Sequence, residues 1–378
     1  MEVQVSSPEL VSEHRVLRCV QCGKCTAGCP VSTNSVLNVR GLLNEILLQP
    51  SLAFNSEESE LWQCTTCMTC SSRCPKGIKP LDVIIQVRSQ LIESGRIQPT
   101  MRDALESTFL HGNPWGKPRE KRNDWAADLK VREADPKAKL DLVYYVGCTV
   151  AYDPRLQKLA RAMVKVLEKA GVAFGILGIE ESCCGNEVRR MGEEGLFEEL
   201  MENNLKLFQE RGARQLMTTS PHCFNVFKNE YPLFEGDVRH YTQVIWELIQ
   251  EERLSFSKEL GWRVTYHDPC FLGKQNDIFE EPRGILGKIP GLEFAELDRN
   301  RERSLCCEGG GGRMWTEDVA QQGRLAEIRV KDAVDLGAEV LVTACPFCLL
   351  TLEDAVKTTG NEEKIRVLDL IEIVETAL

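Results

Sequence analysis

Two copies of one cysteine spacing constrain this 378-residue chain more than any other feature of its sequence. Each copy reads C-x2-C-x2-C-x3-C-P, first at Cys19, Cys22, Cys25 and Cys29 and again at Cys64, Cys67, Cys70 and Cys74. Cysteines three residues apart wrap a compact loop around one inorganic centre, and the proline that ends each copy stops a helix at the fourth cysteine. The odd total of 17 cysteines also argues against a disulfide framework and favours metal or redox chemistry.

The doubled spacing is typical of bacterial two-cluster ferredoxins, in which the fourth cysteine of each run binds the other cluster. It predicts one [4Fe–4S] cluster on Cys19, Cys22, Cys25 and Cys74, and a second on Cys64, Cys67, Cys70 and Cys29. Structural zinc is the weaker alternative, because zinc sites rarely draw their thiolates from such a doubled run. Apolar residues at helical spacing over 36–47 and 81–92 favour an α-helical ferredoxin domain over residues 1–100.

The remaining nine cysteines form an internal duplication. The first copy holds Cys148, Cys183, Cys184 and Cys223, and the second holds Cys270, Cys306, Cys307, Cys345 and Cys348. Landmarks in the two copies are separated by 122, 123 and 125 residues, and the copies differ where Ser220 stands opposite Cys345. The doubled spacing and the duplication together use all 17 cysteines, which predicts that every one is a ligand.

Both copies carry an alternating α/β pattern. Strands are predicted over 140–146, 172–177, 215–219, 263–266 and 340–343, and helices over 156–170 and 194–211. The fold class expected is therefore α+β multidomain, with the ferredoxin domain followed by two α/β lobes at 140–260 and 261–378. The lobes should face each other, with ligands beyond the carboxyl ends of the strands. The amphipathic segment 241–251 is expected to pack on its own lobe.

Residues 101–139 are predicted to be a linker. Its part from 111 to 139 holds 8 Lys/Arg against 5 Asp/Glu and contains Trp115 and Trp125. Such a segment is usually solvated, and the tryptophans leave open a surface on which a partner docks.

The paired-cysteine pattern resembles the CCG domain of heterodisulfide reductase, and its fusion to a two-cluster ferredoxin resembles the D-type subunit of that family. The stretches SLCCEGGGGRMW (304–315) and TACPFC (343–348) carry the likeness. It implies a non-cubane [4Fe–4S] cluster, two cubes fused at an edge, on a catalytic set of Cys270, Cys306, Cys307, Cys345 and Cys348. A further iron–sulfur cluster is implied on the first-lobe cysteines. Glycolate oxidase and glycerol-3-phosphate dehydrogenase iron–sulfur subunits share this architecture, so the fold leaves the reaction open.

Two positions depart from the CCG pattern. Ser220 leaves four thiolates in the first lobe, enough for an ordinary cube, or for a non-cubane cluster with a serine oxygen or an open iron. Glu308 replaces the glycine that follows the paired cysteines, and we expect its side chain to turn out to solvent; the alternative is that it lowers the cluster potential. Gly309 to Gly312 are expected to let backbone N–H groups approach cluster sulfurs.

Two histidines lie beside the predicted ligands. His222 precedes Cys223, and His267 lies three residues before Cys270. A histidine there usually supports the site by hydrogen bonding, and delivery of protons to a leaving thiolate is the alternative.

Composition narrows the function classes. A net charge of −11 argues against a nucleic-acid groove, and no apolar stretch is long enough to span a membrane. No secretory signal is visible, so a cytoplasmic protein is expected. No flavin or nicotinamide motif is found, which predicts a multisubunit complex with a flavin-containing subunit of the reductase A type. The chain is expected to reduce a disulfide at the second lobe, or to act only as an electron conduit.

Overall fold

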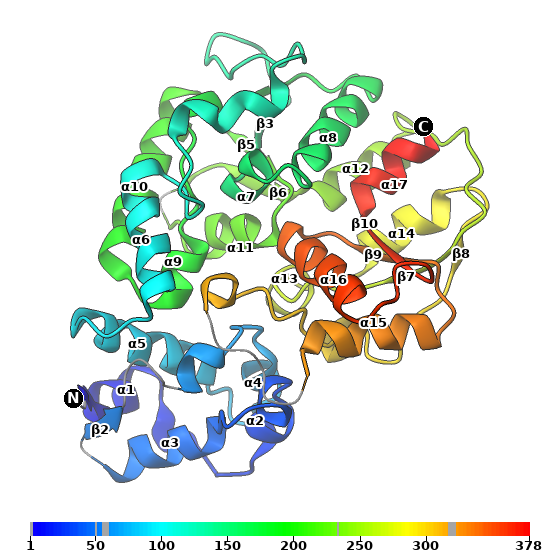
Figure 1. Cartoon of the computed structure of the whole chain (residues 1–378). Coiled ribbons are helices and arrows are strands. Elements are labelled where there is room, and N and C mark those ends of the chain that lie inside the picture. Colours follow the sequence, from blue (N-terminus) through cyan, green and yellow to red (C-terminus); the bar gives the residue numbers. More distant parts are fainter. Residues whose placement is uncertain (1–2, 50, 55–59, 233, 317–322) are drawn as a thin grey trace.

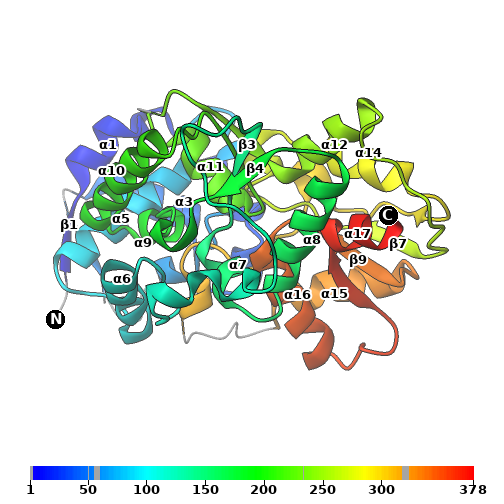
Figure 2. The same ribbon diagram turned by 90° about the horizontal axis from the view of Figure 1, so that it is seen from above.

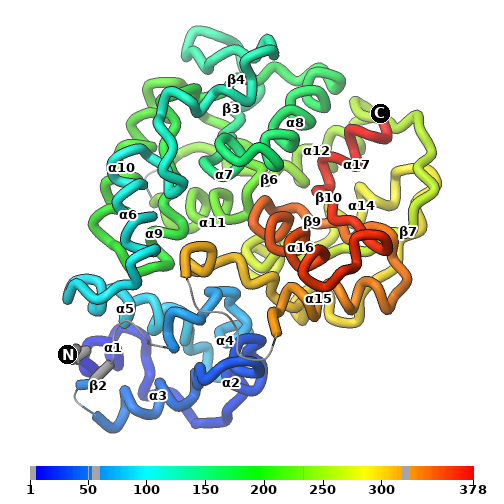
Figure 3. Tube along the Cα trace, in the orientation of Figure 1, coloured from blue at the N-terminus to red at the C-terminus, as the bar shows by residue number. Residues whose placement is uncertain are grey.

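Three regions of secondary structure follow one another in the computed structural model (Figure 1). It describes residues 3–49, 51–54, 60–232, 234–316 and 323–378. A helical N-terminal region is followed by two lobes, each built on a four-stranded sheet, so the predicted α+β multidomain class is confirmed. The N-terminal region lies against both lobes, and the C-terminus lies in the part of the second lobe that is farthest from the N-terminal region (Figure 3).

The N-terminal region is helical apart from one antiparallel strand pair, β1 (Val3–Ser6) and β2 (Ser51–Phe54). Its helices are α1 (Ser7–Glu13), α2 (Lys24–Ala27), α3 (Val39–Leu48), α4 (Thr69–Ser72) and α5 (Pro80–Glu93). Helix α3 begins at Asn38, whose side chain accepts a hydrogen bond from Gly41 N at 2.9 Å. Helix α5 begins at a proline and buries most of one face. Both predicted helices are confirmed, although Val36 lies before α3 and is exposed.

The first lobe is a parallel sheet of order β4-β3-β5-β6 with helices on its faces (Figure 2). Its strands are β3 (Leu142–Tyr145), β4 (Phe174–Ile176), β5 (Gln215–Thr218) and β6 (Asp237–His240). Its helices are α7 (Cys148–Tyr152), α8 (Gln157–Lys169), α9 (Asn186–Met191), α10 (Glu194–Glu210), α11 (Pro221–Asn229) and α12 (Tyr241–Gln250). Strand β3 is buried along its whole length, as expected of a strand covered on both faces.

The second lobe repeats this topology as a parallel sheet of order β8-β7-β9-β10. Its strands are β7 (Arg263–Tyr266), β8 (Glu293–Phe294), β9 (Val340–Thr343) and β10 (Arg366–Asp369). Its helices are α13 (Gly273–Asn276), α14 (Glu280–Lys288), α15 (Leu325–Asp335), α16 (Pro346–Thr358) and α17 (Leu370–Ala377). The duplication in the cysteine pattern is therefore a duplication of the whole α/β unit.

The two lobes exchange their last helices across a pseudo-twofold arrangement. Helix α12 of the first lobe packs against α14 of the second, and α17 of the second packs against α8 of the first. Helix α12 therefore packs against both lobes. The sequence had suggested that it would pack only on its own lobe. Arg155 joins the lobes on the surface by donating to Glu353 at 2.7 Å and to both oxygens of Glu372.

The segment between the N-terminal region and the first lobe exposes most of its charged residues between 111 and 139, as expected, but its tryptophans are packed. It contains α6 (Pro99–His111) and the 3₁₀ segment η4 (Arg119–Ala126). Trp125 and Arg122 are each only 2% exposed, and the half-buried Trp115 packs against Trp315 with tilted rings whose centroids are 5.3 Å apart. The tryptophans are therefore anchored inside the protein and do not form the docking surface that the sequence left open.

Across the described ranges, every helix is too short or too polar to cross a lipid bilayer.

A buried carboxyl at the lobe interface predicts a pH-dependent stability. Asp369 accepts a hydrogen bond from Tyr241 Oη at 2.6 Å, and burial raises its pKa to about 7. Between pH 5 and 7 the unfolded carboxyl is already ionised while most of the folded one keeps its proton, so stability should fall by roughly 2 kcal/mol as pH rises. Guanidinium unfolding across this range should show a flatter profile for Asp369→Asn. The exposed Asp103→Asn, as control, should keep the wild-type slope; equal slopes for all three proteins would contradict the prediction.

Candidate iron–sulfur sites

The two N-terminal cysteine runs fold into the same backbone turn. Gln21 and Gly23 in the first run have φ of 52° and 77°, and Thr66 and Met68 at the matching positions of the second have 52° and 66°. These left-handed residues bend each run so that its cysteines converge before the short helices α2 and α4. Three of the four residues are not glycine, so the turn is held by its surroundings despite the strain.

The four thiols of the first predicted site line one cavity. Cys19, Cys22 and Cys25 come from the first run and Cys74 from the end of the second, together with Arg40 and Lys76. This is the crossed arrangement that the spacing predicted. Cys22 is exposed, and the other three are partly buried, so this outer site lies at the protein surface.

The second crossed set forms an inner, buried site. Cys29 from the first run lies with Cys64, Cys67 and Cys70 of the second. Burial raises the pKa of the Cys64 thiol to about 12, with Cys29 and Cys67 adding to the rise and Arg88 opposing it.

The first-lobe cysteines meet beyond the carboxyl ends of the strands, as predicted. Cys148 follows β3, and its Sγ lies 3.9 Å from that of Cys183. Cys184 and Cys223 complete the group, and Ser220 hydrogen-bonds to Cys223. A hydroxyl thus stands beside the four thiols where the second lobe has a fifth.

The second-lobe cysteines also come together. Cys270 contacts Cys306, Cys307 contacts Cys348, and Cys348 contacts Cys345 at the start of α16. All five are at most 8% exposed.

The inner site lies directly against the second lobe, a contact that no sequence pattern announced. The Cys67 thiol interacts with Cys306, whose Sγ also lies 3.4 Å from Thr65 Oγ1. Buried Lys274 spans the same boundary, because its Nζ donates to Thr69 Oγ1 at 2.9 Å and to Ser304 O at 2.6 Å. A positive charge therefore lies between the two groups of thiols.

His222 connects the two lobes. Its Nδ1 lies 2.8 Å from Glu187 Oε1, and the ring also hydrogen-bonds to Cys345 of the second lobe. Burial opposes its charge, but these two contacts raise the pKa of His222 to about 10. Glu187 also accepts from Gly312 N at 2.8 Å, so it links first-lobe helix α9 to the second-lobe glycine loop. His222 therefore holds the lobes in register at their cysteine groups.

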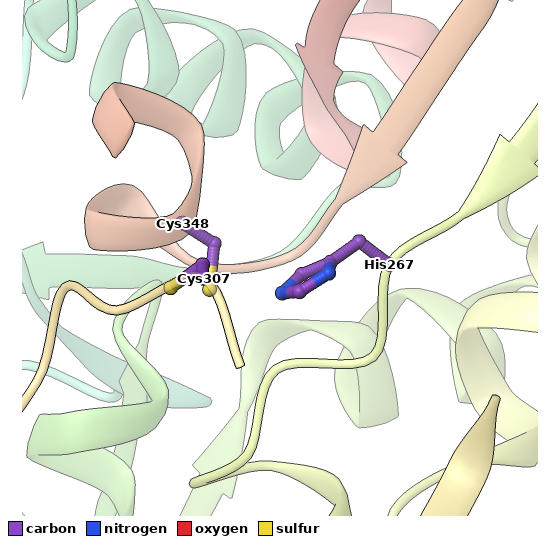
Figure 4. Close-up of side chains that lie close together, drawn as sticks. All are labelled: His267, Cys307 and Cys348. Atoms are coloured by element: carbon purple, nitrogen blue, oxygen red, sulfur yellow. The ribbon is translucent and has the colours of Figure 1, made fainter. Parts of the chain in front are cut away.

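His267 behaves differently. Its ring points toward Cys307 and Cys348, and one ligand atom from each of the three residues lies within 4.8 Å of the others (Figure 4). Its Nδ1 accepts a hydrogen bond from Arg329 Nε at 3.2 Å. Burial, helped by Arg329, holds the pKa of His267 well below its usual value. The ring is therefore neutral and suited to hydrogen bonding with the thiols rather than to delivering protons.

The expectation that Glu308 turns out to solvent was wrong. The residue is 8% exposed, and its side chain accepts from Arg324 Nε at 2.7 Å and from Leu325 N at 2.9 Å, at the start of α15. Its φ is 66°, close to the 79° of Gly185 at the matching position in the first lobe. The ion pair with Arg324 neutralises the charge and holds a residue that is strained in this conformation.

The glycine loop has two roles. Gly309 N–H bonds to Cys307, which fits the expected approach to sulfur. A Cβ on Gly311 would lie 2.5 Å from Cys64 O, and one on Gly310 would lie 3.0 Å from Thr65 O. Gly310 and Gly311 therefore lack side chains because they pack against the inner-site backbone.

Buried Arg88 ties the three regions together. It donates to Cys64 O at 2.8 Å in its own region, to Arg190 O at 2.8 Å in the first lobe and to Gly311 O at 3.0 Å in the second. The sequence analysis did not identify Arg88, Lys274 and Glu187, because the residue type alone does not show whether a charged side chain is buried or exposed to solvent.

The donor sets fit iron–sulfur clusters. Each group offers four or five thiols, and thiolates select soft metal centres. Burial and mutual repulsion hold the pKa of Cys70 and Cys184 well above the usual value, so such groups need a cation to remain thiolates together.

The N-terminal region and the lobes each match a known family. Residues 15–78 match a 4Fe-4S dicluster domain, and residues 142–228 and 264–353 match a cysteine-rich domain named CCG. A solved structure, described as a hypothetical protein from Helicobacter pylori, aligns over 98% of this chain and 72% of its own with a TM-score of 0.54 and 14% identity. At that identity the likeness concerns the fold alone.

Several curated relatives align over most of the chain. The probable iron-sulfur-binding oxidoreductase FadF of Bacillus subtilis is 37% identical over 84% of this chain and 46% of its own length. EtfAB:quinone oxidoreductase of Syntrophomonas wolfei is 36% identical over 88% and 48%. This chain therefore spans about half the length of these two proteins. The D-type subunit of the dihydromethanophenazine:CoB--CoM heterodisulfide reductase of Methanosarcina barkeri is 33% identical over 95% of this chain and 93% of its own.

Replacing Arg88 by Met should destabilise the protein strongly. The change leaves carbonyl acceptors of all three regions without a buried donor, and each unsatisfied group costs about 1–3 kcal/mol. We expect the free energy of unfolding to fall by about 3 kcal/mol or more in denaturant titrations. Arg102→Met on the exposed face of α6 is the matched control, and a similar loss in both variants would contradict the prediction.

Proposed function

We propose that this chain relays single electrons between its outer cysteine site and its second lobe. The chain belongs to the iron–sulfur protein family of the D-type heterodisulfide reductase subunits. The contact between Cys67 and Cys306 carries the proposal. It joins the inner site to the second lobe. The crossed runs join the outer site to the inner one, since Cys74 lies at the outer site and Cys29 at the inner site, so the succession begins at the exposed Cys22 and ends at buried thiols.

The proposed ligands are the groups described above. Cys19, Cys22, Cys25 and Cys74 would hold one [4Fe–4S] cube, and Cys29, Cys64, Cys67 and Cys70 the second. Cys270, Cys306, Cys307, Cys345 and Cys348 would hold a non-cubane cluster, and Cys148, Cys183, Cys184 and Cys223 a further cluster. Such clusters supply one-electron redox chemistry when bound.

The residues around these groups set the conditions for that chemistry. Backbone N–H groups point at sulfur, from Glu308 to Cys306 at 3.3 Å and from Gly185 to Cys183 at 3.4 Å. Such donors and the buried cation of Lys274 favour the more negative, reduced state. Burial of the inner and lobe thiols excludes water from them.

A partner must supply the electrons, because no dinucleotide fingerprint is present in the sequence. We propose a flavin-containing subunit, of the reductase A type in the family's terms, within a multisubunit complex.

Reduction of a disulfide at the second lobe is the second candidate function. The intact set of five thiols favours it, because this is the site that the family pattern associates with that reaction. The burial of all five thiols favours the conduit alternative, in which the terminal acceptor lies on another subunit.

The duplication offers a matched pair of variants that test the ligand assignment. Cys345→Ser should remove the second-lobe cluster and lower the iron content of anaerobically purified protein, while the N-terminal cubes keep their paramagnetic resonance signals. Ser220→Ala, at the equivalent first-lobe position, should leave the number of thiols and the iron content unchanged. Unchanged iron in Cys345→Ser would overturn the assignment, and zinc in place of iron would overturn the function.

The disulfide candidate has its own test. The reduced protein is mixed with a disulfide, and its paramagnetic resonance spectrum is followed under anaerobic conditions. Oxidation together with a new thiol-bound signal that is absent from Cys345→Ser would favour disulfide reduction. An unchanged spectrum would exclude the catalytic role and leave electron relay as the proposed function.

A further inference from the structure

The surface around the outer site is positively charged in a negatively charged protein. Residues 14–44 and 61–81, which carry the outer cysteines, contain no Asp or Glu, although the whole chain has 57 acidic against 46 basic residues. Both segments contribute exposed cations, namely Arg15, Arg18, Lys24, Arg40, Arg73, Lys76 and Lys79. Within the described part of the chain, none of these cations forms an ion pair with a carboxylate.

Large apolar side chains are exposed on the first of these segments, residues 14–44. Leu17 is 79% exposed and Val20 is 56% exposed, on either side of Cys19, and Val36 is 62% exposed before α3. Cys22 is the one exposed cysteine among all 17. Val20, Cys22, Arg40 and Lys76 line the outer cavity together. We name the three apolar residues, the seven cations and Cys22, all of them exposed on the segments that carry the outer cysteines, the Cys22 face.

We propose that the Cys22 face docks an acidic redox protein that exchanges electrons with the outer site. The proposal rests on the relay function and adds the place and the charge of the partner. Apolar contacts surrounded by charge are typical of transient interfaces, and unpaired cations attract an acidic partner at long range. One electron leaves the reduced partner and one arrives at the outer site, with no bond made or broken and no proton transferred.

A protein partner fits this surface better than a lipid surface. Membrane-binding segments place their apolar residues along one face of an amphipathic helix. Leu17 lies in the three-residue segment η1 (Val16–Arg18), and Val20 and Val36 lie in loops outside any helix. Leu17 and Val20 lie directly beside Cys19 of the outer site, where an electron-transfer partner would bind and where a lipid anchor would have no need to lie.

Charge reversal tests the proposal on the whole, cluster-loaded protein. Arg18, Lys24 and Lys79 are replaced together by Glu, and reduction by a flavodoxin of strongly negative net charge is followed by stopped flow. At low ionic strength the second-order rate constant should fall at least about tenfold, because steering is lost. The wild-type rate should fall with added salt, whereas the rate of the variant should not.

A matched control carries the same change of charge elsewhere. Lys258, before the first strand of the second lobe, and Lys288 and Lys364 within that lobe are exposed, and their replacement by Glu should change the rate less than about twofold. Replacing Val20 and Val36 by Ser should lower the rate while keeping its dependence on salt, because only the apolar contact is removed.

The outcomes separate this proposal from the relay function. Iron content and the signal after full reduction with dithionite should be equal in the wild type and the charge variant. Absence of the outer cluster from the wild type would overturn the relay itself. Equal flavodoxin rates in proteins that hold the cluster would overturn the docking proposal alone. Binding of the wild type, but not the variant, to phosphatidylglycerol vesicles with no change in flavodoxin rate would make the face a lipid-binding surface instead.

Discussion

The arrangement of the three regions depends on one buried guanidinium. Arg88 on α5 forms no ion pair among the described residues, although Glu187 is near enough to favour its charge, and it donates to backbone carbonyls in the N-terminal region and in both lobes. Since a buried cation must be fully hydrogen-bonded, these three backbones have to meet at one place. That place is where the inner cysteines reach the second lobe. The interaction that orders the regions therefore also brings two groups of thiols into contact.

The two lobes have the same topology because of the duplication, but their cysteine groups differ. Their last helices are exchanged symmetrically, α12 onto α14 and α17 onto α8. The cysteine groups are not symmetric, because Ser220 replaces a thiol and the inner site touches only the second-lobe group among the thiol contacts described. His222, from the lobe with fewer thiols, hydrogen-bonds to Cys345 of the other. The first lobe thus supports the second as well as holding its own four thiols.

Much of the fold could be predicted from the sequence, because periodicity and cysteine spacing are local signals. Helices α3 and α5, strands β3, β5, β7 and β9 and the crossed N-terminal groups follow directly from such patterns. The errors concern residues whose environment is set by distant parts of the chain. Glu308 is buried because Arg324 reaches it, and Trp125 is buried because the first lobe covers it. The sequence alone suggested that both side chains would be exposed to solvent.

The sequence by itself determined which cysteines form each of the four sets of thiols. The fixed cysteine spacing in the loops and the fixed ends of the strands restrict where each thiol can lie. Only the tertiary structure decided which groups are neighbours and which lies at the surface. Those relations depend on buried hydrogen bonds between residues far apart in the chain, such as Lys274 with Thr69 and Glu187 with Gly312. The physical reason is that the desolvation of a charged side chain is decided by packing, and no local pattern of residues records it.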